Sequence, residues 1–477
     1  MESIPEKVLQ ETDVLCLFGF DEEETKRSLQ SWLTIPGKSL LFLGTEFPFE
    51  MEMFVSTCRT SVFQRFSYIF SSFLKEDRLV NMQILRDAYQ KIEWQVHLEA
   101  SDYQDLGVQV FRNLYTNLGK LADRKSFTSL KGCLQGLPAV ICGAGPSLKD
   151  RVPFLRQAAE RGIVFAGGAA LEALSSFSVP IHIAAGIDPN PSYERCKMIG
   201  SFQAPFFYQS RFSHELLFHV QGPAFQVPSS SGLCLEEELF DFDGGGTVTT
   251  FCTALALHLG CYPIIFVGMD LAYGEEQEKY AQTPVARDSK SSAMLYEGVY
   301  TQKDWVIAGK WLEYLTQQHE SVSFYRVGTY GLKVEGIVDL PESKILETLS
   351  ICSQDIIGRL HLLQSCAKEE SCLLQKTEIE QSLQRSAACV ENILKLYHQS
   401  YPEDPSSQGN FIIHIFALYE EFLYKHMLEP LWKIWQFPME RNLTDAYAKS
   451  ISPWLFFQRV LKEYMRSVEE SYAARTL

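Results

Sequence analysis

The sequence lacks the features that mark membrane and secreted proteins. No apolar run approaches the roughly 18 residues needed to span a bilayer, and the longest candidates, such as residues 263–269, have the length of a strand. The amino-terminal stretch MESIPEKVLQETD is polar and acidic, without the basic and apolar regions of a secretion signal. These absences predict a protein with no membrane span and a cytoplasmic location.

An excess of basic charge is also missing. The formal net charge is -16 and the isoelectric point is near 5.2, so phosphate backbones are repelled and nucleic acid is not an expected partner. The twelve cysteines form no CxxC pair, which argues against a zinc site or a disulfide framework and favours reduced thiols. The sequence contains no Walker loop with GK[ST], no GxSxG elbow and no HExxH motif.

What is present is an alternation of apolar strands and amphipathic helices, typical of an α/β protein. We expect a central Rossmann-like domain with a mostly parallel sheet in residues 126–340. A smaller, degenerate α/β domain is expected in residues 1–125, and an α-helical region in residues 341–477. The aromatic stretch 411–435 is predicted to be core or a subunit contact, so an oligomer could form through the carboxyl-terminal helices.

The expected elements follow from apolar runs and their spacing. Strands are predicted at 14–18, 40–43, 139–142, 163–166, 181–185, 205–208, 264–267 and 323–327. Helices are predicted at 21–32, 84–94, 147–161, 169–176, 248–259, 309–318, 374–397, 411–427 and 454–471, with a further strand at 95–98. Pro402, Pro405 and Pro453 are expected to separate the last helices.

The strongest local signal is PAVICGAGPSLKD, in which a strand leads through a glycine loop into a helix. Gly143 and Gly145 allow a tight turn and a close approach of the backbone to a ligand. Pro146 suits a first helical turn, Ala144 and Ser147 offer an amide and a hydroxyl, and an anion fits there. The loop is therefore a candidate phosphate site; the alternative is a turn whose glycines serve packing alone. Replacing Gly145 by Val should abolish nucleotide binding and leave the fold largely intact.

Two further strand ends carry acids. Asp188 and Asn190 lie in GIDPNP, where Asp188 could accept ribose or sugar hydroxyls, hold a metal, or cap the turn around Pro189. Asp270 follows the strand 264–267, and a divalent ion shared by Asp188 and Asp270 is a candidate metal site.

A second glycine-rich helix start lies in DGGGTVTTF. Gly245, Gly246, Thr247 and Thr249 offer amides and hydroxyls to an anion or a sugar, or Thr247 is simply an N-cap after a flexible loop. Among the histidines, His214 is the best candidate for a general base. Asp188, Asp270 and His214 are thus the candidate catalytic residues.

These segments, in this order between about residues 137 and 340, resemble the family of MptE-like 6-hydroxymethylpterin diphosphokinase domains. The matching motifs are GAGPSL, FAGGAALEAL with GIDPNP, and GGTVTTFCTALALHLG with PIIFVGMDLAYG. This family also forms the central domain of the motility-associated factor (Maf) flagellin glycosyltransferases. Maf proteins resemble bacterial sialyltransferases, which bind CMP-sugars through a similar Gly-x-Gly-Pro-Ser loop. The three-region layout is closer to Maf than to the smaller archaeal pterin enzyme.

The resemblance implies a glycosyltransferase that moves a nonulosonic (sialic-like) sugar from a CMP-sugar donor to a protein Ser or Thr hydroxyl. The implied contacts are Gly143, Gly145 and Ser147 with the phosphate, Asp188 and Asn190 with the ribose or base, and Gly246, Thr247 and Thr249 with the sugar carboxylate or phosphate.

Two alternatives stay open. One is a pyrophosphokinase that uses ATP with Mg²⁺ held by Asp188 and Asp270. The other is a non-catalytic nucleotide-binding scaffold whose helical region binds partners. One departure from the family is that GEEQEKYAQ stands where many relatives carry a histidine after DLAY.

Overall fold

The computed structural model describes most of the chain, and its residues form two compact units. The described residues are 4–35, 38–43, 54, 58, 65–71, 86, 89–90, 92–94, 106–117, 127–191, 203–227, 242–274, 293–350, 356–366, 376–400, 409–440, 443 and 445–473. Residues 1–107 and 380–466 form one unit, and residues 108–379 and 467–477 form the other. These limits differ from the three regions expected from the sequence, because residues 380–466 belong to the same unit as the amino-terminal residues.

The amino-terminal part of the first unit contains a three-stranded parallel sheet. Its strands β1 (Val14–Phe18), β2 (Ser39–Leu43) and β3 (Phe66–Phe70) lie in the order β2-β1-β3. The helices α1 (Glu6–Glu11), α2 (Glu22–Ser28) and α3 (Gln30–Leu33) occur between or before these strands. The predicted strands 14–18 and 40–43 are confirmed, and β3 is an element that the sequence did not predict. The predicted strand 95–98 lies outside the described residues.

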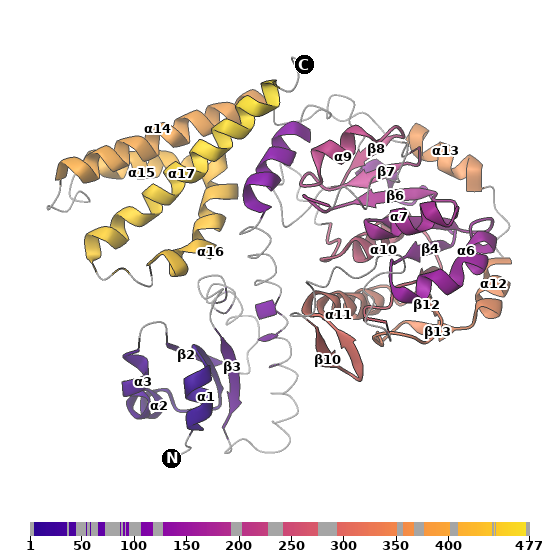
Figure 1. The fold of residues 1–477 in the computed structure, drawn as a ribbon, viewed down its shortest axis with the longest axis horizontal. Coiled ribbons are helices and arrows are strands. Elements are labelled where there is room, and N and C mark those ends of the chain that lie inside the picture. The colour runs from indigo at the N-terminus through magenta and orange to yellow at the C-terminus, as the bar shows by residue number, and fades with distance from the viewer. Residues whose placement is uncertain are drawn as a thin grey trace. The chain divides into compact units, whose positions relative to one another are not determined.

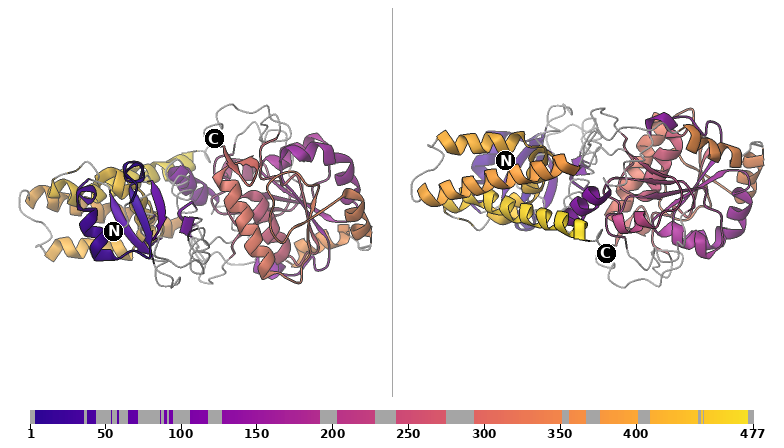
Figure 2. Two further views of the ribbon diagram at one scale, coloured as in Figure 1. Left: turned by 90° about the horizontal axis from the view of Figure 1, so that it is seen from below. Right: turned by 90° about the horizontal axis from the view of Figure 1, so that it is seen from above.

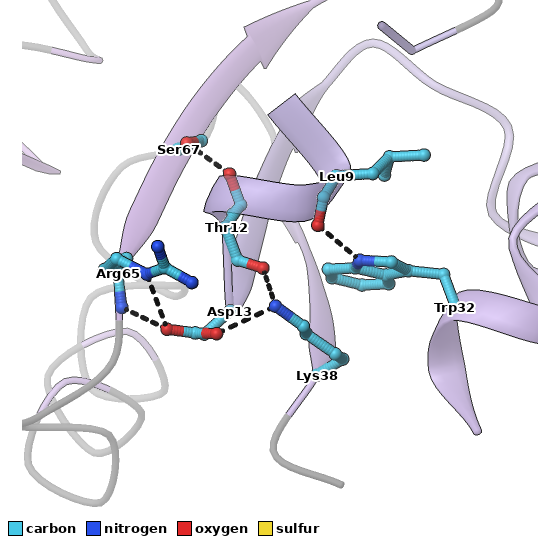
Figure 3. Close-up of polar contacts among 7 residues, drawn as sticks. All are labelled: Leu9, Thr12, Asp13, Trp32, Lys38, Arg65 and Ser67. Atoms are coloured by element: carbon cyan, nitrogen blue, oxygen red, sulfur yellow. Dashed lines mark hydrogen bonds and ion pairs between the residues drawn. The ribbon is translucent and has the colours of Figure 1, made fainter. Parts of the chain in front are cut away.

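A charged cluster joins the amino ends of these three strands (Figure 3). Asp13 precedes β1, and it accepts hydrogen bonds from Lys38 Nζ at 2.8 Å and from Arg65 Nε at 3.2 Å and backbone N–H at 3.0 Å. Lys38 and Arg65 directly precede β2 and β3. Burial works to raise the pKa of Asp13, but the hydrogen bonds from Lys38 and Arg65 outweigh it and lower this pKa to about 2. Since ligands of parallel sheets bind at the carboxyl ends of strands, this cluster is structural.

The carboxyl-terminal part of the first unit contains helices in its described residues. Their helices are α14 (Lys376–Ser400), α15 (Gly409–Glu420), the π-helix η6 (Tyr424–Leu428), α16 (Glu429–Glu440) and α17 (Ala446–Ala473). The prediction that Pro453 ends a helix is wrong, because α17 continues through it. The aromatic stretch is partly core and partly surface: Phe411 is buried, whereas Phe416 is 64% exposed.

The second unit contains an eight-stranded sheet in the order β13-β12-β9-β4-β5-β6-β7-β8, and every neighbouring pair is parallel. Its strands are β4 (Ala139–Cys142), β5 (Ile163–Gly167), β6 (Ile183–Gly186), β7 (Phe206–Tyr208), β8 (Ala224–Gln226), β9 (Ile264–Val267), β12 (Phe324–Val327) and β13 (Val338–Leu340). Two short strands, β10 (Met294–Tyr296) and β11 (Val299–Thr301), form a separate antiparallel pair. The predicted α/β class with a central parallel sheet is therefore confirmed.

Helices cover both faces of this sheet (Figures 1 and 2). One face packs against α10 (Val248–His258), α11 (Lys303–Gln318) and α13 (Ile356–Cys366). The other packs against α6 (Val152–Ala158), α7 (Ala169–Ser176), α9 (His214–Phe218) and α12 (Glu342–Ser350). Successive strand residues alternate between the two cores, as in β4, where Ile141 faces the first and Val140 the second. The strands are thus apolar on both sides, which is why the sequence shows them as unbroken apolar runs.

The order of the strands reverses between β4 and β9. From β4 the chain builds β5, β6, β7 and β8 on one side, and it then returns through α10 to add β9, β12 and β13 on the other. In open α/β sheets, ligands bind at such a switch point, outside the carboxyl ends of the strands. The two loops that leave β4 and β9 are therefore the candidate ligand-binding site.

Candidate functional site

The GAGPS loop and the loop after β9 are hydrogen-bonded to each other at the switch point. The N–H of Gly143 donates to the carbonyl of Val267 at 2.8 Å, and the N–H of Gly145 donates to the carbonyl of Gly268 at 2.8 Å. These bonds extend the β4–β9 ladder beyond the strands. Among the described residues, the N–H of Ala144 makes no hydrogen bond, so it is the donor of this loop that is left for a ligand.

Ser147 and Asp270 form the most direct link between the two loops. The backbone N–H of Ser147 donates to Asp270 Oδ2 at 2.8 Å, and its hydroxyl donates to Oδ1 at 2.5 Å. Both donors of Ser147, its N–H and its hydroxyl, are therefore bound to a carboxylate of the protein. A carboxylate held by an N–H and an O–H at the start of a helical turn shows that this position accepts an anion.

Asp270 is almost completely buried, with 3% of its surface exposed. Burial raises the pKa of Asp270, while the hydrogen bonds from Ser147 and the charges of Arg326 and Arg151 act to lower it. Arg326 is itself bound by Asp339, with Nε–Oδ1 at 2.8 Å and Nη2–Oδ2 at 3.1 Å. Arg151 Nη1 contacts Glu342 Oε1 at 2.8 Å, and its buried Nε has no hydrogen-bond partner in the described structure. The carboxylate thus lies near two cations whose charges are already largely compensated.

The two glycines of the loop are required by this close packing. A Cβ on Gly145 would lie 2.5 Å from Asp270 Oδ2 and 2.7 Å from the carbonyl oxygen of Gly268. A Cβ on Gly143 would collide with the same carbonyl. The expectation that Gly145→Val leaves the fold largely intact is therefore wrong, because the added side chain would strike backbone atoms of the neighbouring loop.

The turn that follows the loop is tighter than predicted. Residues Pro146–Arg151 form a 3₁₀ helix, and the α-helix α6 begins only at Val152 and ends at Ala158. The predicted α-helix 147–161 is thus shorter than expected. Pro146 occupies the first position of the turn, where its missing N–H costs no hydrogen bond.

The threonines of the second glycine loop form a capping box at the start of α10. The hydroxyl of Thr247 accepts from the N–H of Thr250 at 3.2 Å, and the hydroxyl of Thr250 accepts from the N–H of Thr247 at 3.0 Å. Thr247 therefore caps the helix, which was the second of the two roles considered from the sequence. Thr249 is half-buried, and its hydroxyl makes no hydrogen bond within the described part of the chain.

The position of this helix start is fixed by neighbouring groups. Asp243 accepts from the N–H of Gly245 at 2.8 Å and from Trp311 Nε1 on α11 at 2.6 Å. A Cβ on Gly167, the last residue of β5, would lie 2.6 Å from a methyl group of Val248. The first turn of α10 therefore lies beside the carboxyl end of β5, one strand from the GAGPS loop.

Asp188, Asn190 and His214 lie together at the ends of β6 and β7. Asp188 is exposed, and its Oδ1 accepts from the N–H of Asn190 at 2.9 Å, while its carbonyl accepts from the N–H of Ser213 at 3.2 Å. The Asp188 carboxylate thus caps its own turn, which was one of the roles considered from the sequence. Because the side chain is exposed, it is also accessible to a ligand. His214 begins α9 and is half-buried.

Helical residues 108–117 hold these loops, a role that was not predicted from the sequence. Asn113 and Asn117 are one turn apart on this segment and are buried. Asn113 Nδ2 donates to the carbonyls of Pro189 at 2.8 Å and Arg211 at 2.9 Å. Asn117 Nδ2 donates to the carbonyls of Ser210 at 3.2 Å and Phe212 at 2.9 Å. The only signal available in the sequence was the spacing of two asparagines four residues apart.

The structure does not bring Asp188 and Asp270 together. Asp270 follows β9 and Asp188 follows β6, and β4 and β5 lie between these strands. Three strand spacings separate the ends of β6 and β9 by about 14 Å, which does not favour one ion shared by the two aspartates. The described residues also contain no group of three or more His, Cys, Asp or Glu side chains that could hold a metal. A metal shared by Asp188 and Asp270 is therefore not supported.

The departure at GEEQEKYAQ lies, after its first residue Gly274, in the undescribed residues 275–292. Among the described helices, none has both the length and the apolar character required to cross a bilayer.

Comparison with known proteins agrees with the motifs and the fold. No curated protein sequence matches the chain. The computed structure is similar to one solved as "Structure of MAf glycosyltransferase from Magnetospirillum magneticum AMB-1", with a TM-score of 0.56 and 12% identity over 94% of this chain and 72% of that one. At this identity the similarity shows the fold. Residues 112–276 match the family described as "6-hydroxymethylpterin diphosphokinase MptE-like". The family resemblance predicted from the sequence motifs is therefore confirmed, as a similarity of residues 112–276 to this family.

Proposed function

We propose that this chain is a glycosyltransferase that binds a nucleotide sugar at the carboxyl edge of the eight-stranded sheet. The observation that carries the proposal is the meeting of the GAGPS loop with the Asp270 loop at the switch point between β4 and β9. The fold shared with a protein described as a MAf glycosyltransferase supports the choice of reaction.

The donor phosphate is placed at the GAGPS loop. The N–H of Ala144 is open to it, and the donors of Ser147 already hold an anionic group. A phosphate can take these donors only if the carboxylate of Asp270 moves away or if a cation links the two anions, since like charges in contact repel. Ligand binding at this loop is therefore coupled to the position of Asp270.

Only two neighbouring side chains of this site, those of Asp270 and Ser147, suit a magnesium ion. Mg²⁺ is commonly held by one or two carboxylates together with substrate phosphates, and Asp270 and the hydroxyl of Ser147 could supply two adjacent oxygen ligands. Such an ion would neutralise the charge of the leaving phosphate. The strand order does not favour Asp188 as a further ligand.

The finer assignment is a nonulosonic sugar carried by CMP, with a protein Ser or Thr hydroxyl as acceptor. Asp188 and Asn190 would contact the ribose or base, because both are exposed beyond β6. Gly246 and Thr249 at the start of α10 would contact the sugar carboxylate. His214 would remove the proton of the acceptor hydroxyl as the sugar transfers to it.

The family name favours a second candidate, an ATP-dependent diphosphokinase that acts on a pterin alcohol. This reaction transfers two phosphoryl groups together and depends on Mg²⁺ bridging the ATP phosphates. The same GAGPS loop would hold them, with Asp270 and Ser147 near the ion. A third candidate is a scaffold that binds a nucleotide without turning it over.

A thermal-shift series separates the three. The full chain is heated with CMP, CDP, ADP and ATP, each with and without Mg²⁺, and transfer is then assayed with the nucleotide that stabilises it. Stabilisation by cytidine nucleotides is expected for the glycosyltransferase. Stabilisation by ATP with Mg²⁺, but not by CMP, would favour the diphosphokinase. Stabilisation without turnover of any donor would identify a scaffold, and the absence of a shift with every cytidine nucleotide would exclude the CMP-sugar donor.

A further inference from the structure

Two buried asparagines on the same helical segment make nearly the same bonds, with one difference. Asn113 and Asn117 each donate two hydrogen bonds from Nδ2 to backbone carbonyls of the loops that follow β6 and β7. The Oδ1 of Asn117 is buried and has no hydrogen-bond partner in the described structure. The Oδ1 of Asn113 instead accepts from Gln109 Nε2 at 3.0 Å and faces His214, lying 3.2 Å from its backbone N and 2.7 Å from Nδ1 of its ring.

These bonds fix which atom of each group carries a proton. The carbonyls of Pro189 and Arg211 can only accept, so the atom of Asn113 that faces them must be the NH₂ group. The other amide atom is then the oxygen, which can only accept. The backbone N–H of His214 and its Nδ1 must therefore both donate to it, and Nδ1 carries the hydrogen.

We propose that Asn113 is a positioning residue, which holds His214 in the Nδ1–H tautomer and thereby places the basic lone pair of its imidazole on Nε2. In this tautomer, Nε2 is the atom that can take a proton from an acceptor hydroxyl. A base oriented by a third group through its other ring nitrogen is an arrangement that activates a hydroxyl nucleophile. The tautomer assignment stands by itself, and its catalytic consequence rests on the proposed transfer to a hydroxyl.

Burial and connectivity explain why an asparagine serves here. Asn113 is fully buried, so loss of either end would leave carbonyls or an imidazole N–H without a partner in a dry environment. Its neutral side chain orients the imidazole without adding a negative charge beside it. The elements that pack around His214 carry four charged residues close in sequence to the residues named here: Arg112, Asp188, Arg211 and Glu215. Of these, Arg112 is paired with Glu470 at 2.6 Å.

The test is a nitrogen NMR spectrum of the full chain with ¹⁵N-labelled histidine, recorded at a pH where the histidines are neutral. The signal of His214 is assigned by its loss in the His214→Gln variant. The wild type should show a protonated Nδ1 and an unprotonated Nε2 at this residue. Asn113→Ala should move the population toward the Nε2–H tautomer, whereas Asn117→Ala, a variant that loses the same number of carbonyl bonds, should leave the Nδ1–H tautomer in place.

A wild-type His214 protonated on Nε2, or an unchanged tautomer in a folded Asn113→Ala variant, would overturn the proposal. If Asn113→Ala does not fold, Asn113→Asp keeps the acceptor oxygen, and loss of the Nδ1–H signal in that variant would overturn it equally. In a transfer assay, kcat of Asn113→Ala should fall at least tenfold below that of Asn117→Ala, with KM changed less than threefold. The expected tautomers without transfer activity in any form of the protein would refute the proposed function and leave the positioning role intact.

Discussion

The carboxylate of Asp270 accepts hydrogen bonds from both the backbone N–H and the hydroxyl of Ser147, a residue 123 positions earlier in the chain. The pair joins the loop that leaves β4 to the loop that leaves β9, so it spans the switch point of the sheet. A ligand that places a phosphate on this loop has to compete with a group of the protein. If a nucleotide binds here as proposed, its affinity should depend on Asp270 as well as on the glycines.

Asp270→Asn tests this competition directly. Without divalent cations, the variant should bind the phosphorylated ligand identified in the thermal-shift series about fivefold to tenfold more tightly, because a negative charge is removed from the phosphate position. With Mg²⁺, the variant should lose affinity relative to wild type if the carboxylate is a ligand of the ion. Calorimetry under both conditions measures the two effects. Equal affinities in all four measurements would show that the phosphate lies elsewhere.

Glycines of the two loops should respond differently to a side chain. Gly145→Val should lower the melting temperature strongly, since its Cβ would lie 2.7 Å from the Gly268 carbonyl oxygen. Gly246→Ala should leave the melting temperature within about 2 °C of wild type, because its Cβ would have no neighbour within 4 Å and any change of ΔG would be below about 0.5 kcal/mol. Gly246→Ala is therefore the cleaner probe of ligand approach. Differential scanning calorimetry, followed by nucleotide titration, distinguishes the two roles.

Thr247 and Thr249 should separate stability from binding. Thr247→Ala removes a helix cap and should cost about 1 kcal/mol of unfolding free energy. Thr249→Ala should change stability little and weaken the binding of a sugar carboxylate, since its hydroxyl makes no bond within the described structure. Urea unfolding and ligand titration of both variants provide the comparison. A Thr249→Ala protein that binds as tightly as wild type would remove this residue from the site.

Asp13 should make the first unit sensitive to acid. Its pKa is lowered to about 2 in the folded protein, compared with 3.8 for an ordinary aspartate, so the ionised form stabilises the fold. This stabilisation is present above pH 3.8 and is lost as the pH falls through about 2. Allowing for solvent screening of a partly exposed group, it contributes about 1–2 kcal/mol.

The corresponding variant is Asp13→Asn. Its unfolding free energy should be lower than that of wild type at pH 7, and the difference should shrink between pH 4 and pH 2. Chemical denaturation of the full chain, followed by circular dichroism, measures both values. A difference that stays constant down to pH 2 would mean that the side chain acts through its shape and not through its charge.

Much of the sheet could be predicted because each buried strand is an apolar run that stops at a glycine or a turn. The predicted limits of β4, α7 and β9 agree with the structure to the residue. The strands β8 and β13 were missed because they have three residues each, and as edge strands they are only partly buried. Strand β3 was missed because its residues are all half-buried and carry no alternation.

The sequence allowed single residues of the candidate site to be predicted, but not which of them lie in contact. Ser147 and Asp270 each follow an apolar strand, so both could be recognised as residues at the carboxyl edge. Their contact depends on the order of the strands, which the spacing of apolar residues does not encode. Because the strand order was unknown, Asp188 and Asp270 were predicted to share a metal ion. Asn113 could not be recognised, because its role depends on carbonyls 76 and 98 positions away.

The helical segment that carries Asn113 also contacts residues near the carboxyl terminus, which the ribosome synthesises much later. Arg112 pairs with Glu470, and the hydroxyls of Tyr115 and Tyr472 and of Thr116 and Ser471 are within hydrogen-bond distance, across 355 to 358 positions. At about 5–20 residues per second, a ribosome needs roughly 20–70 s to synthesise the later partners after it has made the earlier ones. During that interval these three pairs cannot form. Completion of the His214 edge is therefore timed by translation, and a nascent chain arrested before residue 467 would carry the loops and the sheet without the full support of the helix that orients the histidine.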